Sequence, residues 1–427
     1  PNCTVGSSIT LITDPVGNET WGTGIYMRDR SLLNMTGGSI SGAQATNYIA
    51  GYYGGAIYAD ISSSVVLDTV SLTDNAAYGG GAIGLDGYSS AMLTSVYFES
   101  NDSLNKGGAI DAAGASSVFC DTCIFTDNTS SDGGAIAVRG GSFLTDQSGD
   151  YSGNEASSDG GAIHINGGEA TFTSSSFVGN ESNGAGGAVY AYNATATITF
   201  SSSEFRSNSA FTDDGGAIAS QRASDLDVSS TIFDSNISLY GDGGAIRFAP
   251  AFYTNDLTID ASSFEGNESG GDGGAISIYK GDEISLLDNE YLRNSSDDDG
   301  GAVFASRSVA LTSERGLFFA NVAGGSGGAW SEQDSSSALV FVNNTVVENM
   351  ADEGGGLFLD GTTDSYVVNN TLLGNEASST GAHVHAENGT VRLINNIFAW
   401  GLDGGGVYGD VTAEAGSDLY YNDVWDN

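Results

Sequence analysis

The sequence is poor in basic residues and in proline. It holds 12 Lys plus Arg against 54 Asp plus Glu, so its formal net charge is −42. A field of this sign repels nucleic acid and anionic lipid, and we exclude both as partners. Only 3 prolines accompany 63 glycines, and 40% of the residues are hydrophobic, which is not the composition of a disordered linker.

Long apolar runs and a cysteine framework are also absent. No segment approaches the roughly 18 apolar residues of a membrane-spanning helix, so we predict no membrane insertion. Three cysteines do not make a disulfide scaffold. Cys120 and Cys123 form CDTC, which lacks the second half of a zinc site, and we expect either a local disulfide or two free thiols. Cys3 is left over and is able to reach another chain.

Two short motifs recur along most of the chain at a regular spacing. Gly-Gly-Ala copies end at Ala56, Ala82, Ala109, Ala135, Ala162, Ala188, Ala217, Ala245, Ala275, Ala302 and Ala329, and a looser form continues at Gly356, Ala382 and Gly406. A second motif, in most copies an aromatic residue followed by two residues and Asn, keeps the same spacing from LTDN at Asn75 and weakens to VVEN and LLGN near the end. Its Asn comes five to seven residues before the Gly pair. Self-similarity of this kind is the signature of a repeat architecture.

Within each repeat the apolar residues alternate, as they do in strands. Ile163 and Ile165 share one side of the chain, and His164 and Asn166 share the other. One repeat cannot bury its own apolar side, so successive repeats must stack. Propeller blades of about 40–45 residues are too long for this period. We therefore predict an all-β fold, a single-stranded right-handed parallel β-helix of about 14 coils with roughly 26–30 residues per coil.

The repeats also set the predicted domain organisation. We expect one domain over residues 1–427, with GGA/FxxN coils at 37–406. Residues 1–36, which carry Trp21, are expected to form an N-terminal cap because an uncapped coil exposes a sheet edge. Residues 407–427 are expected to form a C-terminal cap, in which Tyr420, Tyr421 and Trp425 close the last coil.

The asparagine of the second motif is expected to form a ladder. Its amide both donates and accepts, so equivalent residues of stacked coils can bond one another. The predicted ladder contains Asn101, Asn128, Asn154, Asn180, Asn208, Asn236, Asn267 and Asn294. We interpret the glycosylation-like sequences at Asn180 and Asn267 as part of this buried row.

These paired motifs resemble the repeats of the polymorphic outer membrane proteins of chlamydiae. The resemblance covers roughly residues 37–406, with GGAI copies from Gly54 to Ile276 and GGAV at Gly186 and Gly300. It implies a passenger similar to the pectin-lyase-like β-helices. It also implies a secreted or cell-surface protein, often an adhesive one.

Acidic residues precede the Gly pairs in several repeats. In a stacked coil these carboxylates would form a column one strand spacing apart, and bare charges at that distance repel by about 3–4 kcal/mol at an effective dielectric near 20. We therefore predict Ca²⁺ between neighbouring coils, held by Asp214, Asp242, Asp272 and Asp299. The alternative is a solvated acidic edge that keeps the β-surface soluble, or that marks a salty habitat.

Aromatic residues are expected beside this column, on the outward side of the next strand. Aromatic rings with a few polar neighbours suit sugar rings, so the predicted glycan-binding residues are Tyr190, Tyr192, Arg247, Tyr279 and Phe304. The alternative is that these are ordinary surface aromatics without a ligand. A host or cell-surface protein is a second possible partner.

The functional prediction is a non-enzymatic surface protein that serves as an adhesin, a spacer or an extracellular structural component. Open solenoid ends invite strand pairing, so homo-oligomers that stack end to end into a filament form one variant. The alternative is a polysaccharide lyase or glycoside hydrolase of pectin-lyase-like fold, in which Asp242, Arg247 and Asp272 would carry the chemistry. The acids follow the repeat instead of clustering once, and this favours the non-enzymatic interpretation.

Overall fold

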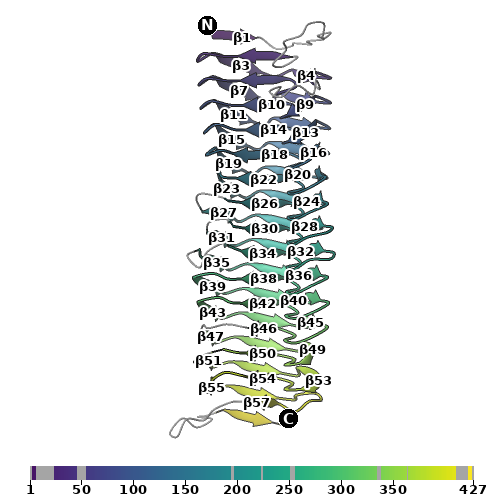
Figure 1. Ribbon diagram of the computed structural model, residues 1–427, viewed down its shortest axis with the longest axis vertical. Helices are drawn as coiled ribbons and strands as arrows, with labels where there is room; N and C mark the ends of the chain where they lie inside the picture. The colour runs from purple at the N-terminus through teal and green to yellow at the C-terminus, as the bar shows by residue number, and fades with distance from the viewer. Residues whose placement is uncertain are drawn as a thin grey trace. The chain divides into compact units, whose positions relative to one another are not determined.

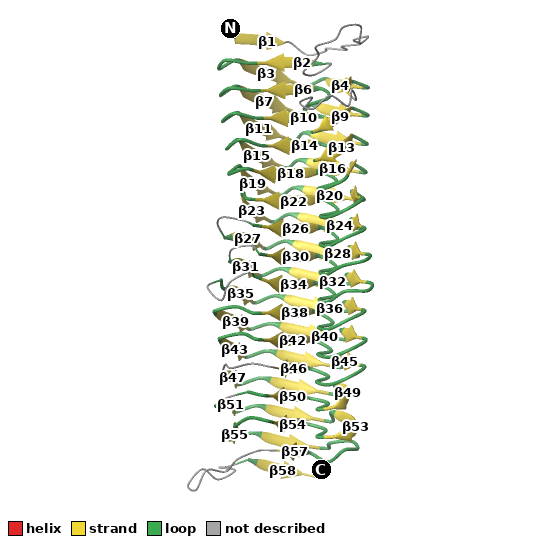
Figure 2. Cartoon of the chain, viewed as in Figure 1, coloured by secondary structure: helices red, strands yellow, loops and turns green. Residues whose placement is uncertain are grey.

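The computed structural model describes residues 2–5, 24–45, 54–193, 197–222, 225–250, 255–333, 338–362, 364–409 and 422–425. The chain divides into two compact units, Pro1–Ser209 (unit 1) and Ala210–Asn427 (unit 2). Every described residue belongs to a strand, a turn or a loop (Figure 2). The predicted division into caps and one domain stays a prediction.

A single turn of the chain explains how the repeat folds. In unit 1, β10 (Ile83–Leu85), β11 (Ser90–Thr94), β12 (Tyr97–Glu99) and β13 (Asp102–Lys106) follow one another around four sides. In β11, Ala91 and Leu93 are buried while Met92 between them is exposed, which is the alternation of a strand with one face in a core. Each strand pairs in parallel with its equivalent one repeat later, and four parallel sheets result. We name them sheets A to D.

Unit 1 contains the first strands of each sheet (Figure 1). Sheet A has β1 (Asn2–Val5), β3 (Leu32–Thr36), β7 (Ser64–Asp68), β11, β15 (Ser117–Asp121), β19 (Phe143–Gln147), β23 (Glu169–Thr173) and β27 (Ile198–Ser201). Sheet B has β2 (Ile25–Met27), β6 (Ile57–Ala59), β10, β14 (Ile110–Ala112), β18 (Ile136–Arg139), β22 (Ile163–Asn166) and β26 (Val189–Tyr192). Sheet C has β4 (Ser39–Ser41), β8 (Ser71–Thr73), β12, β16 (Ile124–Thr126), β20 (Asp150–Ser152), β24 (Ser176–Val178) and β28 (Glu204–Arg206). Sheet D has β5 (Gln44–Ala45), β9 (Ala76–Gly79), β13, β17 (Thr129–Ser130), β21 (Glu155–Ala156) and β25 (Glu181–Ser182), and β29 (Ser209–Ala210) spans the unit boundary.

Unit 2 repeats this organisation. Sheet A has β31 (Leu226–Ser229), β35 (Leu257–Asp260), β39 (Glu283–Leu287), β43 (Ala310–Glu314), β47 (Ala338–Val342), β51 (Ser365–Val368) and β55 (Val391–Ile394). Sheet B has β30 (Ile218–Gln221), β34 (Ile246–Ala249), β38 (Ile276–Tyr279), β42 (Val303–Ser306), β46 (Trp330–Gln333), β50 (Leu357–Asp360), β54 (Val384–Glu387) and β57 (Val407–Gly409). Sheet C has β32 (Ile232–Asp234), β36 (Ser263–Glu265), β40 (Glu290–Leu292), β44 (Leu317–Phe319), β48 (Thr345–Val347), β52 (Thr371–Leu373), β56 (Ile397–Ala399) and β58 (Asp423–Trp425). Sheet D has β33 (Ile237–Ser238), β37 (Glu268–Ser269), β41 (Ser295–Ser296), β45 (Val322–Ala323), β49 (Met350–Glu353) and β53 (Glu376–Thr380).

The predicted architecture is confirmed. The protein is an all-β parallel solenoid with turns of roughly 27 residues, about 13 in number. Residues 25–36, expected in the N-terminal cap, form β2 and β3, which pair with β6 and β7. Trp21, Tyr420 and Tyr421 lie outside the described residues, whereas Trp425 is described and is exposed.

The Gly pair is needed where the chain passes from sheet D to sheet B. Gly160 has a φ of +67°, which residues with a Cβ adopt only rarely. A Cβ on the next residue, Gly161, would lie 2.0 Å from the carbonyl oxygen of Gly187 on the following turn. The first glycine therefore supplies a left-handed backbone conformation, and the second allows two turns to approach closely.

Aromatic stacks fill the interior behind sheet C. In unit 1 the ring centroids of Phe98 and Phe125 are 4.6 Å apart, and Phe125 and Tyr151 follow at 4.8 Å. In unit 2 Phe233 and Phe264 stack at 4.7 Å. Because this separation matches the spacing of adjacent strands, the aromatic residue of the second motif packs on its own equivalent from turn to turn.

A row of asparagines occupies the corner between sheets C and D. Asn101 donates its side-chain N–H to Asn128 Oδ1 at 2.9 Å and to the Leu72 carbonyl at 2.9 Å, and the same Asn128 oxygen accepts the backbone N–H of Asn101. In unit 1 this row contains Asn75, Asn101, Asn128, Asn154, Asn180 and Asn208, all fully buried. In unit 2 it contains Asn236, Asn267, Asn294, Asn321, Asn349 and Asn375, also fully buried.

The parallel register corrects one position of the sequence alignment. Leu357 pairs with Val384, so Gly356 lies opposite His383 and not opposite Ala382. The imidazole of His383 therefore takes the place of the small Ala and is fully buried beside Asn375. His385, two residues on, lies on the other side of β54 and contacts Phe358 and Tyr408. The HVH sequence thus does not direct both rings to one site.

No helix within the described part of the chain is both long and apolar enough to cross a membrane.

Candidate functional site

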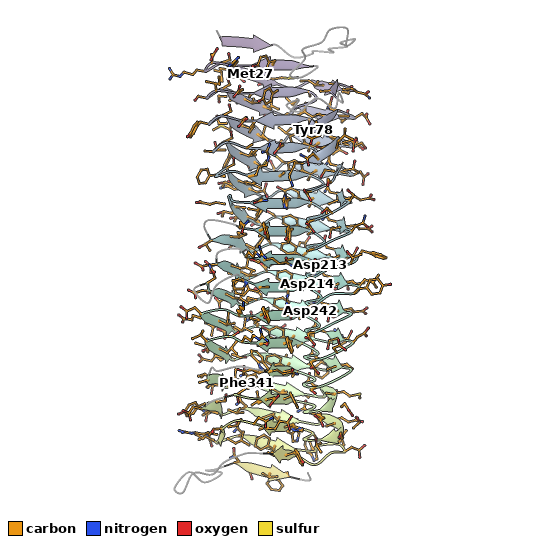
Figure 3. All side chains as sticks on the ribbon, viewed as in Figure 1. Met27, Tyr78, Asp213, Asp214, Asp242 and Phe341 are labelled. Atoms are coloured by element: carbon orange, nitrogen blue, oxygen red, sulfur yellow. The ribbon has the colours of Figure 1, made fainter. Side chains whose placement is uncertain are left out.

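The predicted acidic column lies in unit 2, where the chain passes from sheet D to sheet B. Figure 3 shows Asp213 and Asp214 directly above Asp242 on the next turn. Asp214 Oδ1 accepts the backbone N–H of Asp242 at 2.9 Å, and Asp242 Oδ1 accepts that of Asp272 at 2.9 Å. Asp272 Oδ1 then accepts the N–H of Asp299 at 3.1 Å. The four acids are therefore joined through the backbone from turn to turn.

Arg247 compensates the charge at the first two members of the column. Its Nη1 lies 3.0 Å from Asp242 Oδ2, its Nε lies 3.3 Å from Asp214 Oδ2, and Nη1 also donates to Ser277 Oγ at 2.5 Å. Burial raises the pKa of Asp214, and the Arg247 guanidinium opposes that rise. Arg247 thus acts as a clamp between two carboxylates on neighbouring turns.

Asp272 has a different environment from Asp214 and Asp242. Burial raises the pKa of Asp272 to about 7; the N–H of Asp299 opposes the rise, and the charges of Asp242 and Asp299 add to it. On the following turn, Asp299 Oδ2 accepts a hydrogen bond from Gln333 at 2.6 Å. Asp272 is therefore partly protonated near neutral pH.

Hydrogen bonds and ion pairs already engage most carboxylate oxygens of the column, which limits the ligands that calcium could use. Oδ1 of each column member already accepts a backbone N–H, and Oδ2 of both Asp214 and Asp242 faces Arg247. Among the described residues, no group of three or more His, Cys, Asp or Glu side chains has the arrangement of a metal site. Calcium binding stays a prediction.

The same contacts bear on the enzyme alternative. A catalytic base must be free to take up a proton, whereas Arg247 is held between Asp214 and Asp242. Asp242 and Asp272 belong to one continuous hydrogen-bonded row and not to an isolated acid pair. The contacts of these three residues are therefore those of a structural row.

The predicted glycan residues are divided between the units. In unit 1, Tyr190 is only 8% exposed because its ring stacks on that of His164, with centroids 5.5 Å apart. The ring centroid of Tyr192 lies 6.1 Å from that of Tyr190. In unit 2, Phe304 is 7% exposed. The outer side of sheet B is thus far more buried than alternation alone predicts.

The third tyrosine of that set, Tyr279, is surrounded by cations. Arg247, Lys280 and Arg307 lie 5.8, 5.2 and 5.3 Å from its ring centroid, and Arg307 donates to the Tyr279 hydroxyl at 2.6 Å. Cation–π contacts of this kind stabilise the local structure. The ring of Tyr279 is therefore engaged within the protein itself.

Exposed aromatic residues lie on the loops that carry the acids. Phe211 and Tyr240 are 50% and 68% exposed and pack edge to face with centroids 5.7 Å apart. They precede Asp213–Asp214 and Asp242 on two successive turns of unit 2. Leu239 beside them is also exposed. We name Phe211, Leu239 and Tyr240 the aromatic platform.

The platform residues are recognisable in the sequence, but aligning the repeat motifs did not identify them. Most equivalent loop positions elsewhere hold small or polar residues, such as Ser157 or Gly270, although Tyr78 and Leu104 in unit 1 are also large. Large residues on two successive turns of this loop, at Phe211 and at Leu239–Tyr240, therefore depart from the common pattern. Exposed apolar groups rimmed by polar ones mark interaction sites.

A charged cluster in unit 1 was also missed. Arg139 forms a two-pronged ion pair with Asp111, at 2.8 Å from Nε to Oδ1 and 2.9 Å from Nη2 to Oδ2. Lys106 pairs with Asp132 on the adjacent turn. Burial, with the nearby Lys106 charge, lowers the pKa of His164 to about 4, so this ring is neutral near pH 7. Residue spacing gave no hint that cations of an acidic chain would gather here.

These features define a parallel β-solenoid with a structural acid row and an exposed platform. Two segments, residues 122–139 and 261–279, match the model of the Chlamydia polymorphic membrane protein repeat. The chain therefore contains repeats of this type on a β-solenoid, as the sequence predicted. The match agrees at a coarse level with a surface-associated protein. No curated protein and no solved structure matches the chain.

Proposed function

We propose that this protein is a surface-displayed adhesin whose solenoid carries a glycan-binding platform in unit 2. The observation that carries the proposal is the exposed pair Phe211 and Tyr240, on the same two loops as Asp213, Asp214 and Asp242. The likeness to membrane-protein repeats supports display at a surface.

The chemistry of the platform selects its ligand. Aromatic rings offer apolar faces to the C–H side of a sugar, while adjacent carboxylates accept hydrogen bonds from its hydroxyl groups. The net charge of −42 disfavours anionic saccharides. The preferred ligand class is therefore a neutral saccharide, and no catalytic step is required.

Binding to an array of neutral and acidic glycans tests this proposal. We expect wild-type protein to bind neutral glycans, and the double variant Phe211→Ala/Tyr240→Ala to lose at least tenfold in affinity. The matched control is Tyr88→Ala, which removes a 75% exposed tyrosine from unit 1. A second comparison is Tyr190→Ala/Tyr279→Ala, which tests the residues first predicted from the sequence.

Two results would contradict the proposal. If the wild-type protein binds no glycan on the array, the proposed glycan-binding adhesin function is wrong. Binding that survives Phe211→Ala/Tyr240→Ala but is lost in Tyr190→Ala/Tyr279→Ala would move the site from the platform to the outer side of sheet B.

A further inference from the structure

The core of unit 1 contains two cysteine thiols where the preceding turn is apolar. Cys120 is an inward residue of β15, and Cys123 is the corner residue that leads into β16. Both are free thiols and both are fully buried. On the preceding turn the inward residue is Leu93, and the residue three positions later is Val96. The two cysteines therefore replace an ordinary apolar pair.

The Cys123 side chain points towards the column of inward residues to which Cys120 belongs. Its Sγ lies 3.6 Å from the carbonyl oxygen of Leu93, the direct neighbour of Cys120 in sheet A. Burial raises the pKa of the Cys120 thiol, and the neighbouring Cys123 adds to that rise. The two side chains therefore share one buried corner of the core.

The next turn gives a measure of the space between these positions. Asp146 pairs with Cys120, and Gly149 takes the place of Cys123. A Cβ on Gly149 would lie 2.8 Å from Asp146 Cγ, the atom equivalent to Cys120 Sγ. A disulfide places each Sγ about 3 Å from the partner Cβ. The corner therefore brings an inward residue and the residue three positions later to disulfide distance.

We propose that Cys120 and Cys123 form an internal disulfide in the mature protein. Two S–H bonds break and one S–S bond forms, and the two electrons and two protons pass to the disulfide of a thiol–disulfide oxidoreductase, which becomes a dithiol. A surface location is compatible with this reaction because oxidising compartments retain disulfides. The bond removes two thiol groups from the core beside the Asp146 carboxyl.

The buried position also sets the order of events. Neither sulfur is accessible once the turns have stacked, and a thiolate is disfavoured there because burial raises the pKa of Cys120. The disulfide therefore forms before the corner closes, and the folded solenoid then protects it from reductants.

Mass spectrometry of the full chain with Cys3→Ser tests the proposal. Chain refolded from denaturant with oxidised and reduced glutathione is expected to resist alkylation after unfolding and to yield a peptide linking Cys120 to Cys123. Chain folded first under reducing conditions, and then given the same glutathione mixture, is expected to form the bond at least tenfold more slowly.

A shifted pair provides the matched control. The variant Cys120→Ala/Cys123→Ala/Phe119→Cys/Thr122→Cys keeps the CxxC spacing but moves both residues off the inward positions. It is expected to remain reduced under the same refolding conditions. Two free thiols at Cys120 and Cys123 after oxidative refolding would overturn the proposal. Equal crosslinking of the shifted pair would show that spacing alone, and not the corner, brings the sulfurs together.

Discussion

The asparagine row and the acid row solve the same problem with different side chains. Both place a side-chain oxygen where it accepts a backbone N–H of a neighbouring turn. The amide also donates, so each Asn bonds the next and the row can be fully buried. An ionised carboxylate has no hydrogen to donate, so the acid row must remain partly exposed and needs Arg247. The neutral row builds the core, and the charged row makes a surface that responds to pH.

Asn128→Ala breaks the neutral row and should have the largest effect. The side chain accepts from Asn101 and donates to the Phe98 carbonyl on the preceding turn, and it donates to Asn154 on the following turn, so its loss leaves several buried groups unpaired. We expect the free energy of unfolding to fall by about 4 kcal/mol, measured by urea unfolding. Asn34→Ala, at an exposed position of β3, should change it by less than about 0.5 kcal/mol. Similar losses for the two variants would contradict a structural role for the row.

Arg247→Met removes the clamp from the acid row and should have the next largest effect. Two half-buried carboxylates then face each other without a cation, and we expect a loss of about 2 kcal/mol at pH 8. The loss should shrink as the pH falls and Asp214, whose pKa is raised by burial, becomes protonated. Urea unfolding at pH 8 and pH 4 measures both values; a loss independent of pH would indicate that only packing was disturbed.

Asp272→Asn sharpens the comparison by making one acid resemble the neutral row. The pKa of Asp272 is about 7 in the folded chain, against about 3.9 for an unfolded Asp, so the folded state binds more protons between these values. Stability contributed by this group therefore falls as the pH rises from about 4 to about 7. The amide oxygen can still accept the N–H of Asp299.

We accordingly expect Asp272→Asn to melt a few degrees higher than wild type at pH 8 and at the same temperature at pH 4. Differential scanning calorimetry at the two pH values makes the comparison. Asp74→Asn, at an exposed corner of unit 1, should leave the melting temperature unchanged at both. A variant of Asp272 less stable than wild type at pH 8 would show that its charge is compensated.

Calcium should produce the smallest change. The prediction made from the sequence requires a higher melting temperature in Ca²⁺ than in chelator, and Arg247 leaves only Asp272 and Asp299 to contribute to it. Calorimetry in the two buffers measures the difference. If the melting temperatures in Ca²⁺ and in chelator are identical, both for wild type and for Arg247→Met, the prediction of calcium binding is wrong.

Features that follow the repeat were predicted from the sequence, and features that depart from the repeat were not. The period, the strand alternation and the spacing of Asn101 and Asn128 followed from regular recurrence, because parallel stacking converts equal spacing into direct contact. A second asparagine row in unit 2, Asn344, Asn370, Asn396 and Asn422, was overlooked although the first three stand in Asn-Asn doublets.

The site was less predictable because it depends on long side chains and on burial. Strand alternation placed Tyr190 and Phe304 on the outer side of sheet B, but it gave no information on how closely neighbouring turns would cover them. Spacing also did not indicate that Arg247 would reach back one turn to Asp214. These outcomes depend on the shapes of particular side chains, which a one-dimensional pattern does not contain.

The parallel register between successive turns has a consequence for how such a gene can change. Ile83 pairs with Ile57 before it and with Ile110 after it, and the same bond recurs on each turn: the Ile57 N–H donates to the Ala82 carbonyl and the Ile83 N–H to the Ala109 carbonyl. A tandem duplication of one whole repeat would therefore give the new segment two compatible neighbours, and it would disturb no pairing elsewhere. Recombination between repeats can thus lengthen or shorten the protein in whole steps, while partial repeats would be selected against.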